Sequence, residues 1–284
     1  MSVKDKALLV SLSVSMWTNA VHDEAVVGDI MKKTSTAHDV HAYKKILIKP
    51  EAMAQVRAAR IALRTYWWSN TLPWGDGGVR VLPAPRYQEF VEKIRELRTE
   101  YEAAVAAFVR EYPKMKMEAR KRLGSLYRDE DFPSLNSIKG KFDCDIDFAP
   151  IPDAGDFRVS LSESEKKELG REVERAVQAN TRGAMQALVG KLQKTVALLS
   201  ERMKEADPGL RRSLIENIAE VCSEVEVFNF TDDKQIESFK KAAEQLTKGA
   251  DLDMLKEDKK ARKTLATKAD EILAKMAMYT GGAS

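Results

Sequence analysis

Three aspartates alternate with apolar residues near the middle of the chain, at Asp143, Asp145 and Asp147. In an extended strand, side chains two positions apart point to the same face, so the three carboxylates should share one face. An EF-hand calcium loop does not fit, because its glycine is absent and Ala154 stands where the ligating glutamate belongs. The pattern favours an acidic, solvated strand face that discourages edge pairing, and the alternative is a docking face for a basic partner.

All three histidines of the chain lie in a polar N-terminal stretch. His38 and His41 are three residues apart and would share a face if this stretch were helical, with Asp39 beside them. Nothing in the sequence fixes the geometry that a metal site requires. We therefore interpret these residues, and His22, as solvated loop histidines and expect no metal ion.

Motifs of known catalytic chemistry are absent from the sequence. It has no glycine-rich phosphate loop ending in Lys-Ser/Thr, no nucleophile elbow, no zinc-protease motif and no paired-cysteine zinc signature. We expect a protein that is not an enzyme and that needs no cofactor. If the chain were an enzyme after all, its only plausible catalytic centre would be the row formed by Asp143, Asp145 and Asp147, which we call the aspartate ladder.

Two groups of residues could bind a partner. The first combines tryptophans with arginines, which can stack on bases or form a protein-binding hot spot; it comprises Arg64, Trp67, Trp68, Trp74 and Arg80. The second is a basic run that could contact phosphates; it comprises Lys114, Lys116, Arg120, Lys121 and Arg122. The alternatives are that the aromatic group plugs the end of a helical core and that the basic run is a solvated helix face.

Composition limits the class of protein. The chain has 284 residues, of which 44% are hydrophobic and 32% are charged, and this high charge suits long helices with solvated outer faces. A net charge of +3 gives no general case for nucleic-acid binding. Two widely spaced cysteines and a short, serine-interrupted apolar run near the N-terminus predict a soluble, cytoplasmic protein without a membrane span.

Periodicity predicts a few strands among many helices. Apolar residues alternate over residues 8–16 and 142–148, and more weakly over 157–159, as expected for strands of a small sheet. We expect loops at 19–45 and 73–78, and Pro113 should break or kink the helix over 85–112. Further helices are expected at 51–69, 115–126, 210–225, 231–246 and 265–276.

The longest predicted helix begins at a capping box formed by Ser162 and Glu165 and could extend to residue 206. Asp207 and Pro208 leave only a short loop, which favours an antiparallel hairpin with the next helix. The predicted fold class is mainly α with a small antiparallel β-sheet and a long, coiled-coil-like helical hairpin. We divide it into a mixed α/β region, 1–160, and a helical region, 161–284. The length of the apolar stripe favours a homo-oligomer.

Several motifs resemble a known family. They are the run from Leu72 to Gly78, the segment 119–124, and the run from Pro152 to Val159. Together they are similar to the domain of unknown function 3150, a family of phage and integrative-element proteins, over about residues 5–245. The resemblance implies an accessory role beside an AAA+ ATPase of the cobalt-chelatase type, and it transfers no catalytic residue.

The sequence thus favours a non-enzymatic helical adaptor or assembly protein of a phage or mobile element, which self-associates or docks on a partner such as an AAA+ ATPase. One alternative is a nucleic-acid-binding accessory factor in phage DNA metabolism. Another is a phage inhibitor of a host defence protein.

Overall fold

A computed structural model describes residues 2–22, 44–155, 162–205, 211–248 and 252–281. The chain forms two compact units that interleave along the sequence. Unit 1 comprises residues 1–11, 70–89 and 147–284, and unit 2 comprises residues 12–69 and 90–146. The predicted division instead falls at a single point near residue 160. The interleaving arises because strands far apart in sequence join one sheet.

A four-stranded antiparallel sheet has the strand order β4-β5-β1-β6. The strands are β1 (Ala7–Ser15), β4 (Leu72–Pro73), β5 (Arg80–Pro83) and β6 (Asp143–Pro150). In the register of β1 with β5, Ala7 lies opposite Pro83 and Val10 opposite Arg80. Both β1 and β6 were expected from their period-two alternation, whereas β4 and β5 flank the predicted loop 73–78 and were missed.

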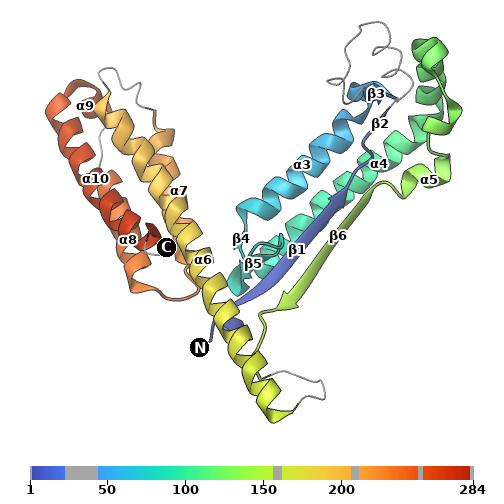
Figure 1. The fold of residues 1–284 in the computed structure, drawn as a ribbon. Helices are drawn as coiled ribbons and strands as arrows, with labels where there is room; N and C mark the ends of the chain where they lie inside the picture. Colours follow the sequence, from blue (N-terminus) through green and yellow to red (C-terminus); the bar gives the residue numbers. More distant parts are fainter. Residues whose placement is uncertain (1, 23–43, 156–161, 206–210, 249–251, 282–284) are drawn as a thin grey trace, which may run out of the picture. The chain divides into compact units, whose positions relative to one another are not determined.

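The helices of unit 1 form a bundle around the second half of α6 (Glu163–Lys204) (Figure 1). Gln186 contacts Thr280 and Ser200 contacts Asp270, so α10 (Lys259–Gly281) runs antiparallel to α6; α7 (Ser213–Phe228) lies against α6 where Lys191 pairs with Glu224. The bundle is completed by α8 (Lys234–Thr247), and α9 (Leu252–Glu257) precedes α10. The predicted class, mainly helical with a small antiparallel sheet, is confirmed.

The two halves of α6 differ in burial. From Ala184 to Met203 its apolar stripe is buried against α7, α8 and α10, while in the first half only Gly170 is buried. The predicted capping box is present, since Ser162 Oγ accepts from Glu165 N and the Glu165 carboxylate accepts from Ser162 N. The helix start is therefore determined locally, whereas its second half is held by packing.

Unit 2 is built on α3 (Ala54–Ser69) and α4 (Tyr87–Leu123, of which Phe90 onward belongs to this unit). Its core contains several aromatic side chains among aliphatic ones, and two buried tyrosines are held by their hydroxyls: Tyr101 donates to Ser15 O and Tyr112 donates to Pro133 O. A short helix, α5 (Leu135–Lys139), precedes β6. A separate two-stranded sheet pairs β2 (Ala20–His22) with β3 (Lys44–Ile46).

Two local predictions need correction. Pro113 does not end the helix, as one form of the prediction had it, because α4 continues through it to Leu123; the other form, a kink at Pro113, stays a prediction. A proline costs one backbone hydrogen bond, and buried neighbours such as Tyr112 and Ala119 hold the helix on both sides. The expected loop over 19–45 is corrected only at its ends, where β2 pairs with β3, while residues 23–43 lie outside the described residues.

Other predictions lie outside the described residues. They are the weak strand at 157–159, the Asp207-Pro208 stop, and His38 and His41. The earliest part of the chain adds one short element, α1 (Val3–Lys6), directly before β1. Within the described residues, no helix combines the length and the apolar character that crossing a membrane requires.

Candidate functional site

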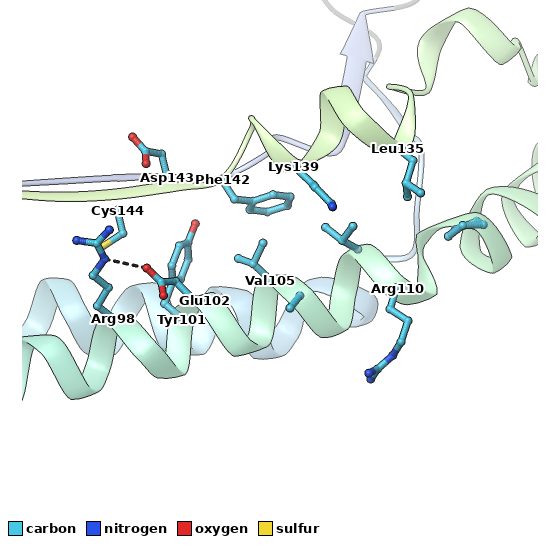
Figure 2. Close-up of a pocket in the computed structure, with 13 residues that line it drawn as sticks. Arg98, Tyr101, Glu102, Val105, Arg110, Leu135, Lys139, Phe142, Asp143 and Cys144 are labelled. Atoms are coloured by element: carbon cyan, nitrogen blue, oxygen red, sulfur yellow. Dashed lines mark hydrogen bonds and ion pairs between the residues drawn. The ribbon is translucent and has the colours of Figure 1, made fainter.

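An apolar groove of about 560 Å³ runs along α4 in unit 2 (Figure 2). Its floor comes from α4, and its other wall comes from α5 and the first residues of β6. The residues that line it are Arg98, Tyr101, Glu102, Val105, Ala106, Val109, Arg110, Pro113, Leu135, Lys139, Phe142, Asp143 and Cys144.

Apolar side chains face each other across the groove. Val105 and Val109 are four residues apart and so share one face of α4, and Figure 2 shows Val105 directed towards Phe142. Leu135 lies on the opposite wall and is 47% exposed, although it is a large apolar residue. Its position is fixed, because Ser134 Oγ accepts a hydrogen bond from Ser137 N and caps α5. The groove therefore offers an apolar surface that is open to solvent.

Charged groups lie at the edges of this apolar surface. At one end Arg98 donates to Glu102 at 2.8 Å, with the exposed Asp143 nearby. Towards the other end are Lys139 and Arg110, and Figure 2 shows the Arg110 side chain directed away from the groove. A ligand of the groove would thus bury its apolar groups against α4 and leave polar groups at the rim.

The buried polar atoms of the groove are not suited to acid–base or nucleophilic chemistry. Burial raises the pKa of Cys144, so its thiol is protonated at neutral pH and is a weak nucleophile. Burial also raises the pKa of Tyr101 to about 12, and its hydroxyl is already engaged with Ser15 O. The geometry supports binding and gives no arrangement of nucleophile and base.

The members of the predicted aromatic and arginine group are divided between the two units. In unit 1, Trp74 is buried in the core, and Arg80 is buried with its guanidinium 2.5 Å from Thr71 Oγ1 and 2.6 Å from Thr71 O. Burial lowers the pKa of Arg80 to about 10, so it is still a cation at neutral pH. Both residues stabilise the sheet end and are not available to a base or phosphate.

In unit 2 the two adjacent tryptophans have different roles. Trp67 is 7% exposed and packs into the unit, whereas Trp68 is 65% exposed. Arg64 is exposed on the same helix. The sequence singled out both tryptophans, and only the structure distinguishes the core residue from the surface residue.

The predicted basic run is partly committed to contacts within unit 2. Arg122 donates to the carbonyls of Ile46 and Leu47, both at 2.9 Å, and so holds the end of α4 to the segment after β3. Lys116 pairs with Asp129 at 3.1 Å, and Arg120 lies 5.6 Å from the centre of the Tyr127 ring. The remaining members, Lys114 and Lys121, are exposed.

The aspartate ladder is exposed on β6, as the alternation predicts, at Asp143, Asp145 and Asp147. Among the described residues, no three His, Cys, Asp or Glu side chains are grouped closely enough to hold a metal ion. These carboxylates are separated along one strand and do not converge on a common point.

Two of the motifs that carry the family resemblance have structural explanations in unit 1. Gly75 has a φ of +64°, and a Cβ there would lie 3.4 Å from the side chain of Asn180 in α6. At Gly170 of α6, a Cβ would lie 3.0 Å from the carbonyl oxygen of Ala154. Both motif loops therefore pack on the first half of α6, where a glycine on one side permits the contact.

A second cavity, of about 750 Å³, lies in unit 1 between the N-terminal segment, residues 152–154 and α6. Its lining is more polar: Lys4 pairs with Asp153, and the Tyr279 hydroxyl donates to Asp233 at 2.8 Å. Burial and this hydrogen bond raise the pKa of Tyr279. Asp233 also caps α8 by accepting from Gln235 N and Ile236 N, so these groups are already used in holding the bundle together.

Comparison of the chain with family models, with curated proteins and with solved structures found no match. The groove was not identified from the sequence, because Val105 and Val109 belong to a stripe typical of a buried helix face. No separate signal marked the groove in the sequence, since most apolar residues of α4, Val109 among them, are buried.

Proposed function

We propose that this chain is a non-enzymatic helical adaptor that acts in the cytoplasm and binds an apolar segment of another protein in the groove of unit 2. The observation that carries the proposal is the apolar groove lined by Val105, Val109 and Phe142, on whose rim the large apolar side chain of Leu135 is 47% exposed. Exposed apolar surface that is held rigidly and rimmed by charge is typical of protein-binding sites.

A protein segment fits the groove better than a small polar substrate does. The lining is mainly apolar, and its buried polar atoms, the Tyr101 hydroxyl and the Cys144 thiol, are engaged or protonated. An amphipathic segment would place its apolar residues on α4 and its polar residues at the rim near Arg98 and Lys139. The family resemblance adds an AAA+ ATPase of a phage or mobile element as a candidate partner.

The experiment begins with a photo-reactive amino acid introduced at Leu135 in the full chain, in the cells that naturally make it. The captured protein is then purified, and its affinity is measured for the unmodified chain and for two variants. Leu135→Glu places a charge in the groove, and Asn136→Glu makes a charge change at the adjacent exposed residue of α5, which does not line the groove.

We expect Leu135→Glu to weaken binding at least about tenfold, which corresponds to about 1.4 kcal/mol. Asn136→Glu should leave the affinity within about twofold. Equal affinities for the two variants would contradict the role of the groove. A glutamate in the first turn of α5 is favourable for the helix, so neither variant should unfold the unit.

Self-association is a second part of the proposal. The first half of α6 carries Leu169, Val173 and Val177 on one stripe, and all three are only half-buried within the chain. A sister chain could cover this stripe. Light scattering over a range of concentrations should then give a mass above 31.9 kDa, and a monomer throughout would remove this part.

Nucleic-acid binding has less support. Three members of the basic run, Lys116, Arg120 and Arg122, already contact groups of the chain itself. The affinity of a nucleic-acid-binding protein should fall steeply with added salt, because each neutralised phosphate releases counterions. Binding of labelled duplex DNA with such a salt dependence would favour this alternative over the adaptor.

A further inference from the structure

The outward face of α3 carries an unusual stripe of exposed residues. They lie at alternating steps of four and three residues and are all exposed: Ala54, Ala58, Ile61, Thr65 and Trp68. Ile61 is 58% exposed and Trp68 is 65% exposed, so the two largest apolar side chains of the stripe face solvent. They are seven residues apart, on the same side of the helix.

The opposite face of α3 fixes this stripe in place. Val56, Leu63 and Trp67 are buried in unit 2, and Tyr66 stacks on Phe90 with ring centres 5.6 Å apart. Because the inner face is packed, α3 cannot rotate to bury Ile61 and Trp68. The exposed stripe is therefore a permanent feature of the folded unit.

The alternating steps of four and three are those of a coiled-coil seam. With Ala58 and Thr65 at the a positions, the d positions are Ala54, Ile61 and Trp68. Small residues alternate with Ile61 and Trp68, which leaves room for knobs from a second helix between them. The stripe has the pattern of one half of a helix pair.

The charges beside the seam have one sign. Arg57 and Arg64 occupy the g positions, directly before the two a positions, and both are exposed. The sequence of α3 contains no aspartate or glutamate, and within the described residues neither arginine has an ion-pair partner. Residues at e and g set the choice of partner in coiled coils through interhelical ion pairs.

This charge pattern decides between possible occupants. A pair of two copies gains no ion pair from these arginines: in an antiparallel pair Arg57 would face Arg64, where like charges oppose pairing, and in a parallel pair the arginines would face the uncharged Ala62 and Ser69. Single-stranded nucleic acid is bound by grooves with several aromatic platforms, whereas α3 offers one exposed tryptophan on a convex helix, beside aliphatic residues. A helix with acidic flanks satisfies both the apolar seam and the arginines.

We propose that the outward face of α3, through Ile61, Trp68, Arg57 and Arg64, is a docking site for an amphipathic helix of a partner protein that carries aspartate or glutamate beside its apolar stripe. The site shares no residue with the groove on α4. It would give the chain a second binding surface, as an adaptor requires, and it does not depend on what fills the groove.

The test uses the full chain and two labelled amphipathic peptides. Both have leucine at the a and d positions; one has glutamate and the other lysine at the e and g positions. Fluorescence anisotropy should show binding of the acidic peptide at least about tenfold tighter than that of the basic peptide. Ile61→Glu should weaken binding of the acidic peptide at least about tenfold.

A charge reversal provides the sharpest control. The double variant Arg57→Glu/Arg64→Glu should no longer bind the acidic peptide and should bind the basic one, because the charge beside the seam is inverted. Arg95→Glu, at an exposed arginine of α4 in the same unit, should leave both affinities unchanged. The gain of binding by the double variant also shows that it is folded.

Three results would overturn the proposal. They are failure of both peptides to bind, equal binding of both peptides to the unmodified chain, and tighter binding of labelled oligothymidine than of the acidic peptide. The last would assign the face to nucleic acid. Because Leu135→Glu leaves α3 unchanged and Ile61→Glu leaves the groove unchanged, the failure of one site is distinguishable from the failure of the other.

Discussion

The two units differ in how far their apolar residues are buried. In unit 1 the apolar stripes of α6, α7, α8 and α10 close on one another, and side chains such as Leu192 and Ile218 are fully buried. In unit 2 the groove on α4 and the seam on α3 remain open to solvent. Under the proposed function, the bundle of unit 1 uses its apolar residues mainly for its own stability, whereas unit 2 keeps part of its apolar residues for a partner protein; in unit 1 only the first half of α6 is left for a sister chain.

The largest difference in stability between the two units is expected for a pair of leucine substitutions. Leu192→Ala should destabilise unit 1 by about 2–5 kcal/mol, because it leaves a cavity in a packed core. Leu135→Ala, in the open groove of unit 2, should change stability by less than about 0.5 kcal/mol. Urea denaturation followed by circular dichroism measures both. Similar costs would mean that the groove is not open in the free protein.

A second contrast concerns one buried lysine in each unit. Lys45 in unit 2 is 2% exposed; it pairs with Asp131 at 2.7 Å and donates to Leu126 O at 3.0 Å. Lys45→Ala would remove the ion-pair partner of the largely buried Asp131 carboxylate and should lower the free energy of unfolding by about 3–5 kcal/mol. Lys240 in unit 1 contacts the exposed Glu226 and Glu244 and the partly exposed Glu237, so Lys240→Ala should cost about 1 kcal/mol or less.

The two lysine variants are compared by their denaturation midpoints at neutral pH. Equal midpoint shifts would contradict the assignment of Lys45 as an internal tie of unit 2. The double variant Lys45→Ala/Asp131→Ala provides the control, since removing both charges should recover part of the loss.

Within unit 1, two glycines of α6 should respond in opposite directions. Gly170→Ala pushes a methyl group to 3.0 Å from Ala154 O and should destabilise the unit by about 1–3 kcal/mol. Gly183→Ala meets nothing within 4 Å and should stabilise it by about 0.5–1 kcal/mol, as expected in a helix interior. Thermal denaturation of the two variants gives the sign. A stabilising Gly170→Ala would show that the motif loop at 152–155 does not pack closely on α6.

The smallest expected effect is at Asp270 on α10. Hydrogen bonds from Lys204 and Ser200 lower the pKa of Asp270, so its folded state favours the carboxylate. The stabilisation is therefore complete above the unfolded pKa of about 3.9 and is lost as pH falls through the lower folded pKa. Asp270→Asn should cost less than about 1 kcal/mol at pH 7, since the pair is exposed.

Stability of Asp270→Asn and of the unmodified chain should converge as the solution is acidified below pH 4, because both then carry an uncharged side chain. Urea midpoints measured across this range check the convergence. A difference that persists at the lowest pH would assign the effect to packing instead of charge.

Local patterns predicted part of this structure well. The alternation that marks β1 and β6, the capping box at Ser162 and the stripe of α6 are properties of neighbouring residues, and each was found. Pro113 shows the limit of such rules, because α4 does not end there and continues to Leu123 between the buried Tyr112 and Ala119. The short strands β4 and β5 were missed because their pairing with β1 is long-range.

The candidate binding residues show the same division more sharply. The sequence identified tryptophan and arginine as residue types suited to binding, yet Arg80 proved to be a buried support of Thr71, and Trp67 a core residue. Trp68, its neighbour in the chain, lies on the surface because successive residues of a helix point about 100° apart. Residue type alone could not separate them.

By itself, the sequence determined the helical character of the chain, the places where its longest helix and its two main strands begin, and the lack of a recognisable catalytic motif. Tertiary structure decided which apolar stripes are covered and which remain open, and so created the groove on α4 and the seam on α3. Helix and strand formation depends on residues close in sequence, whereas burial depends on which distant segments pack together, and that is settled only by the folded chain.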